Sequence, residues 1–126
     1  MNSFDERRND LNPVQRVMRA TGYSLQGISA AWRTQPALRY ECVLLALIVP
    51  AALWLGHSGL ERALLIVSWL LVILCELINS AIETIVDRIG KEFHELSGRA
   101  KDLGSAAVFM ALVIAGVVWL FVLVHR

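Results

Sequence analysis

The stretch ELINSAIETIVD, residues 76–87, places three carboxylates and an amide inside a continuing apolar pattern. These four side chains are Glu76, Asn79, Glu83 and Asp87. Their spacings of three and four residues put them on one face of a helix, within an arc of about 80°. Polar groups in a membrane helix are costly to bury and indicate a functional site by default. We therefore expect the fold and the chemistry to be organised around this stripe.

The composition is that of a membrane protein. Of the 126 residues, 56% are hydrophobic, and the charged residues crowd into 5–41 and 76–102 with long apolar runs between them. The formal net charge of +1 gives no basic field that would recruit nucleic acid. Residues 1–12 are polar and are expected to form a disordered tail.

A helix is predicted over residues 13–34, because Asn12 and Pro13 suit an N-cap and a first helical position. Apolar residues recur in it every three or four positions, and the opposite face is basic. This pattern is typical of an amphipathic helix lying in the membrane interface. A plain surface helix packed on other protein is the alternative.

Three membrane spans are predicted within residues 35–126: 37–55, 60–90, and a third from 102 or 103 to 124. The polar segment 90–101 would connect the last two, with Asp102 as a natural helix cap. Ala107, Ala111 and Ala115 form a small-residue face that permits close helix packing. The expected fold class is therefore an all-α membrane protein.

The distribution of Lys and Arg predicts the orientation. Six of the 12 lie in residues 1–41 and four in 88–101, whereas the opposite side has only Arg62 and Arg126. The positive-inside rule puts the amino terminus and the 88–101 connection in the cytoplasm. The carboxylate stripe then faces the cytoplasmic leaflet, on the side where ATP is found.

No nucleotide-binding, metalloprotease or hydrolase signature is present, so the function must be inferred from the polar stripe itself. Carboxylates can hold Mg²⁺ together with phosphate oxygens, and a partly desolvated carboxylate can act as a general base. Nearby cations can offset the charge of a transferring phosphoryl group. The same set could also bind an ion for transport, or pair internally.

Several segments closely resemble the small prokaryotic integral-membrane diacylglycerol kinases. These are ELINSAIE with VDRIG in residues 76–90, ELSGRAKD in 95–102 and GSAAV in 104–108. Residues 20–32 are similar to the surface helix of that family. The resemblance extends from about Arg16 to Trp119.

The resemblance implies a homotrimer in the bacterial inner membrane, in which each protomer has an amino-terminal surface helix and three transmembrane helices. Active sites would lie between protomers at the cytoplasmic face. The reaction would transfer the γ-phosphate of ATP, with Mg²⁺, to the 3-hydroxyl of diacylglycerol and give phosphatidic acid.

The resemblance also implies roles for individual residues. Glu76 would be the general base, with Asn79 orienting the base or the phosphate and Asp87 supporting the site. Glu83 would be a metal ligand. The implied ATP-binding residues are Arg16, Tyr23, Gln35, Glu83, Glu92, His94, Lys101 and Asp102. The implied lipid contacts are Arg16, Glu76, Ser105 and Trp119.

One departure from the family pattern concerns the metal. The family usually has an acidic second ligand where this chain has Gln35. A neutral amide oxygen is a weaker ligand for Mg²⁺ than a carboxylate. Three other functions stay open: a kinase of another lipid alcohol such as undecaprenol, a small oligomeric ion carrier that uses the stripe as its ion site, and a non-catalytic membrane scaffold.

Overall fold

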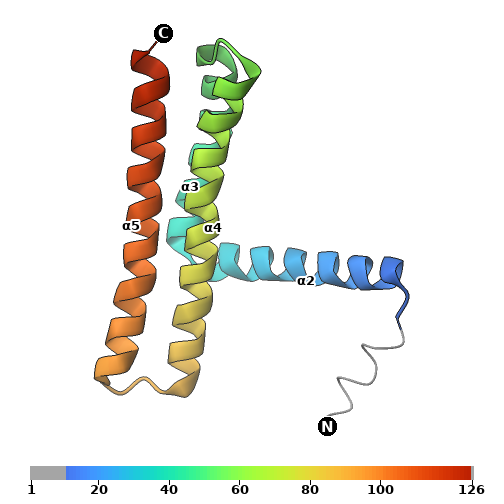
Figure 1. The fold of residues 1–126 in the computed structure, drawn as a ribbon. Helices are drawn as coiled ribbons and strands as arrows, with labels where there is room; N and C mark the ends of the chain where they lie inside the picture. The colour runs from blue at the N-terminus through green and yellow to red at the C-terminus, as the bar shows by residue number, and fades with distance from the viewer. Residues whose placement is uncertain (1–10, 126) are drawn as a thin grey trace. The chain divides into compact units, whose positions relative to one another are not determined.

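The computed structural model describes residues 11–125, and all of its regular elements are helices. They are α2 (Pro13–Thr34), α3 (Pro36–Leu55), α4 (Gly59–Ile89) and α5 (Glu95–Val124). The prediction of an all-α fold is confirmed for this part of the chain (Figure 1). The predicted disordered tail falls on residues 1–10, outside the described part, and on Leu11 and Asn12, which precede α2.

Helix α2 belongs to a compact unit of its own, which ends at Thr34. It begins as predicted at Asn12 and Pro13. The Asn12 Oδ1 accepts a hydrogen bond of 2.8 Å from the backbone N–H of Gln15, and the Gln15 Oε1 accepts one of 3.2 Å from the N–H of Asn12. This reciprocal pair is a capping box, which satisfies two backbone donors that the first helical turn leaves without partners. A location of α2 at the membrane surface stays a prediction.

The second compact unit, Gln35–Arg126, contains the other three helices. Each of them is long and apolar enough to cross a membrane. Helix α3 has 20 residues, which rise about 30 Å and match the hydrocarbon core of a bilayer. Helices α4 and α5 have 31 and 30 residues, so each is longer than a bilayer requires. The three predicted spans are confirmed on length and composition.

Helix α4 packs against both α3 and α5, and α5 runs antiparallel to it (Figure 1). Two indole groups form hydrogen bonds across these helix contacts. The Trp69 Nε1 on α4 donates to the Glu41 carbonyl on α3 at 2.9 Å, and the Trp119 Nε1 on α5 donates to the Leu65 carbonyl on α4 at 3.3 Å. Hydrogen bonds between helices inside a membrane each contribute about 0.6–2 kcal/mol.

The packing face of α5 differs from the predicted one. Ala111 and Ala115 are buried together with Val72 of α4, as expected for a small-residue face. Ala107 is exposed, however, and Gly104 is buried instead. Gly104 and Ala111 are seven residues apart and therefore project from nearly the same side of a helix, whereas Ala107 lies at its edge.

The start of α5 also differs from the prediction. The helix begins at Glu95, so the expected connection over residues 90–101 is reduced to Gly90–His94. His94 is the N-cap, and its Nδ1 accepts a hydrogen bond of 3.1 Å from the N–H of Leu96. The prediction that Asp102 caps the helix was wrong, because His94 and the acidic Glu95 already satisfy the helix start.

The turn between α3 and α4 depends on close approach at Gly56. The Gly56 carbonyl accepts a hydrogen bond of 3.0 Å from the Arg62 Nε, and Ser58 caps α4 through the N–H of Glu61. A β-carbon at Gly56 would lie 2.6 Å from the Arg62 Cγ and 2.9 Å from the Ala52 carbonyl oxygen. The backbone φ of Gly56 is −72°, which any residue can adopt, so only space requires glycine here.

We therefore expect Gly56→Ala to lower the free energy of unfolding by about 1–3 kcal/mol, as overpacking does elsewhere. Gly59→Ala is the matched control, because no atom lies within 4 Å of a β-carbon at that position. Thermal unfolding in detergent micelles measures both variants. Equal midpoints for the two variants would contradict this account of the turn.

Candidate active site

The polar face of α4 is turned away from the solvent-accessible surface of the bundle. Glu76, Asn79 and Ser80 are 6%, 7% and 7% exposed, whereas the apolar Ile78 and Ile85 are 52% and 61% exposed. This inverts the arrangement of a water-soluble helix and fits a helix surrounded by lipid. The predicted stripe therefore faces into the protein at Glu76 and Asn79, is half-buried at Glu83 and reaches the surface at Asp87.

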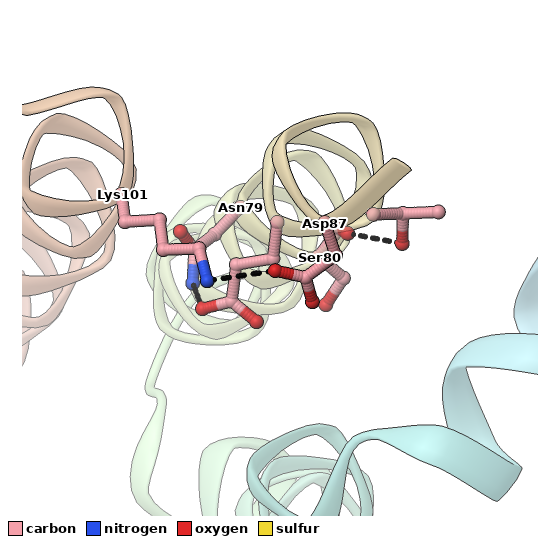
Figure 2. Close-up of polar contacts among 6 residues, drawn as sticks. Asn79, Ser80, Asp87 and Lys101 are labelled. Carbon is pink, nitrogen blue, oxygen red and sulfur yellow. Dashed lines mark hydrogen bonds and ion pairs between the residues drawn. The ribbon is translucent and has the colours of Figure 1, made fainter. Parts of the chain in front are cut away.

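Side-chain hydrogen bonds order this face along the helix. The Asn79 Nδ2 donates to the Glu83 Oε1 at 3.4 Å. The Ser80 hydroxyl donates to the Glu76 carbonyl at 2.8 Å, and the Thr84 hydroxyl donates to the Ser80 carbonyl at 2.8 Å. Each hydroxyl thus bonds to the backbone of the preceding helical turn. Figure 2 draws the bond that the Ser80 carbonyl accepts. Glu76 and Glu83 are seven residues apart and so project from the same face of α4.

An ion pair joins the end of this face to α5. The Lys101 Nζ lies 2.8 Å from the Asp87 Oδ1, and both side chains are about half exposed. Figure 2 shows Lys101 extending from α5 toward the polar face of α4. Because exposed ion pairs contribute little to stability, the consequence of this pair is positional: it holds an ammonium group beside the carboxylates.

A pocket of about 460 Å³ opens where α4 ends and α5 begins. Of the predicted site residues, Asp87, Glu92, His94 and Lys101 line it. The other lining residues are Val86, Gly90, Lys91, Phe93, Ser97 and Gly98. The His94 Nδ1 is engaged in the cap of α5, so a ligand in the pocket would contact the Nε2 edge of the ring. The pocket combines acidic and basic groups, as a site for a metal-bound nucleotide would.

Four other predicted residues of the same unit, Gln35, Asp102, Ser105 and Trp119, do not line this pocket. Asp102 and Ser105 are exposed on α5. Trp119 donates its indole hydrogen bond to α4, and Gln35 is the half-buried N-cap of α3 without a side-chain capping bond. Arg16 and Tyr23 belong to α2, in the other unit. The roles inferred for these residues stay predictions.

One acidic residue was missed at the sequence level. Glu41 on α3 has a buried Oε2 with no hydrogen-bond partner among residues 11–125. Its backbone carbonyl accepts the Trp69 hydrogen bond, which places Glu41 at the contact between α3 and α4. The sequence did contain a signal for Glu41, because this single acid adjoins the apolar run that begins at Cys42. An acid in a membrane helix indicates a functional site, and the same argument identified Glu76.

The carboxylates of this face fit part of the ligand set of a magnesium ion. Glu83 offers a half-buried carboxylate on the same face as Glu76. Within the described residues, no group of three or more His, Cys, Asp and Glu side chains forms a cage for a metal. Mg²⁺ does not require such a cage, because it keeps several waters and is commonly held by one or two carboxylates plus substrate phosphates.

Comparison with known proteins gives consistent matches over most of the chain. Residues 22–123 match the family model described as prokaryotic diacylglycerol kinase. A diacylglycerol kinase of Haemophilus influenzae is 53% identical over 103 residues, which cover 82% of this chain and 87% of the relative. The diacylglycerol kinase of Escherichia coli K12 is 49% identical over 115 residues, covering 91% and 94%. That of Pseudomonas aeruginosa is 47% identical over 110 residues, covering 87% and 89%.

The unpaired carboxylate of Glu41 leads to a prediction about stability. Replacing it with an apolar side chain removes a buried polar atom that has no partner in the bundle, a situation that costs about 1–3 kcal/mol. We expect Glu41→Leu to raise the midpoint of thermal unfolding in micelles.

Glu61→Leu is the contrasting variant, since the Glu61 Oε2 accepts a hydrogen bond of 2.8 Å from the N–H of His57. We expect its midpoint to fall. A fall for Glu41→Leu as well would mean that the Glu41 carboxylate has a stabilising partner in the assembled protein.

Proposed function

Because the chain belongs to the prokaryotic diacylglycerol kinase family, we propose that it transfers the γ-phosphate of ATP to the 3-hydroxyl of diacylglycerol. The products are ADP and phosphatidic acid. The observation that carries the proposal is the buried polar face of α4, which holds Glu76 and Asn79 and continues to the pocket beside Lys101. A lipid hydroxyl at membrane depth and a nucleotide from the cytoplasm could meet along this face.

Glu76 is the proposed general base. Its side chain is buried on a membrane helix, where a carboxylate is poorly solvated and gains from accepting a proton. In an in-line transfer, Glu76 takes the proton of the lipid hydroxyl while the hydroxyl oxygen bonds to the γ-phosphorus. The bond from that phosphorus to the bridging oxygen breaks, and ADP leaves. Asn79, one turn further along α4, orients the base or the phosphate.

The nucleotide is proposed to bind in the pocket between α4 and α5. The Lys101 ammonium offsets phosphate charge, which is the main requirement of phosphoryl transfer. Glu92 and His94 line the same pocket and are proposed to contact the nucleotide, and Asp87 holds Lys101 in place. The resemblance adds Arg16, Tyr23, Gln35 and Asp102 as further proposed contacts.

Magnesium would be held by Glu83 and, more weakly, by the amide oxygen of Gln35, and it would reduce the charge on the ATP phosphates when bound. On the lipid side, the proposed contacts are Arg16, Ser105 and Trp119 in addition to Glu76. We also propose a homotrimer in the bacterial inner membrane with its sites at the cytoplasmic face. The positive-inside count of Lys and Arg supports that orientation.

Glu76→Gln tests the proposal most directly. Gln is almost isosteric but cannot accept the proton, so we expect loss of at least about 100-fold in kcat, in line with the usual contribution of a general base. The measurement follows radioactive phosphate from ATP into lipid in mixed micelles.

Glu61→Gln, the same change in the first turn of α4, should keep the wild-type rate. Normal turnover by Glu76→Gln would exclude Glu76 as the base. Assays with diacylglycerol and undecaprenol side by side separate the two lipid substrates. Ion flux in vesicles without ATP would instead support the carrier.

The glutamine at position 35 leads to a second functional prediction. A carboxylate is a better magnesium ligand than an amide. We therefore expect Gln35→Glu to lower the Mg²⁺ concentration that gives half-maximal activity at fixed ATP. An unchanged Mg²⁺ titration would place Gln35 outside the metal shell.

A further inference from the structure

We propose that Gly104 of α5 is a positioning residue for the Asn79 amide: its bare α-carbon lets Asn79 lie between the two helices with its N–H aimed at Glu83. This inference rests on the proposed kinase function and adds a residue to its site. Gly104 is buried, as is Asn79. A β-carbon built on Gly104 would overlap the Asn79 Oδ1 and would lie 3.2 Å from the Asn79 Cγ and 3.6 Å from the Ile82 Cδ1.

The amide has one favourable orientation at this place. Its Nδ2 donates to the Glu83 Oε1 at 3.4 Å, and its Oδ1 points at the α5 backbone. Exchanging the two ends would turn an amide oxygen toward a carboxylate oxygen, which repels it, and would leave the N–H₂ group against Gly104. The observed orientation is therefore the one in which the donor faces the acid.

The Oδ1 atom is buried and has no N–H or O–H partner within residues 11–125. The β-carbon position of an amino acid replaces one of the two α-hydrogens of glycine, so one Gly104 Cα–H points at this oxygen. Cα–H···O contacts between helices are weak but favourable. Gly104 thus supplies both the space for the Asn79 Oδ1 and a weak Cα–H donor to it.

Other contacts between α4 and α5 fix the register that makes this approach possible. The Trp119 indole donates to the Leu65 carbonyl further along the bundle, and Lys101 pairs with Asp87 on the pocket side. The separation of Asn79 and Leu65 along α4 is nearly equal to the separation of Gly104 and Trp119 along α5. Antiparallel packing requires this equality. The contact at Gly104 lies between the Trp119 hydrogen bond and the Lys101–Asp87 ion pair.

The test is Gly104→Ala, with Gly116→Ala as the matched control on the same helix, because nothing lies within 4 Å of a β-carbon at Gly116. A methyl group at 104 must displace the Asn79 amide and break its bond to Glu83. We expect kcat to fall about 10- to 100-fold, the loss typical of a misplaced catalytic group. Gly116→Ala should stay within twofold of wild type.

A double-mutant cycle separates positioning from a general packing defect. In an Asn79→Ala background the amide is absent and the overlap is relieved, so adding Gly104→Ala should change the residual kcat less than twofold. The double variant should also fold as well as Asn79→Ala alone, even if Gly104→Ala by itself folds poorly.

Two results would overturn the inference alone: a wild-type rate in Gly104→Ala, or independent, multiplying losses in the cycle. Absence of phosphate transfer by the wild-type protein would instead overturn the proposed kinase function, and the inference with it.

Discussion

A membrane helix that carries polar side chains must turn them away from lipid, and this constraint governs the arrangement of α3, α4 and α5. The buried side of α4 contains Glu76, Asn79 and Ser80 together with apolar residues such as Val72, whereas Ile78 and Ile85 are exposed. Helices α3 and α5 pack against α4, and indole hydrogen bonds hold both contacts. Burying polar groups without partners is costly in such surroundings, so the same packing that protects the face also specifies its geometry.

Not every buried polar atom in this arrangement has a hydrogen-bond partner. Two buried oxygens, the Glu41 Oε2 and the Asn79 Oδ1, have no hydrogen-bond partner in the described residues. Glu41 lies on α3, which packs against α4, and Asn79 lies on α4 about one turn after Glu76. A buried polar atom without a partner calls for an explanation such as a catalytic role or a bound water or ion.

The site is built at a transition between two environments. Glu76 and Asn79 lie at the buried end of the stripe, whereas Asp87 and Lys101 are half exposed beside an open pocket. A site with one buried part and one half-exposed part suits a reaction in which one substrate is dissolved in the membrane and the other in water. It also explains why α4 is longer than a bilayer requires, because its last turns form the wall of the pocket.

The sequence by itself determined the helical class, the three spans, the cap at Asn12 and the polar stripe, because these depend on local hydrophobic period and capping chemistry. The family motifs pointed to the same residues of the stripe. Only the tertiary structure decided the start of α5 at Glu95, the burial of Gly104 instead of Ala107, and the burial of the Glu41 Oε2. Those features depend on which faces of neighbouring helices meet, and contacts between residues distant in sequence leave no periodic signal in the chain.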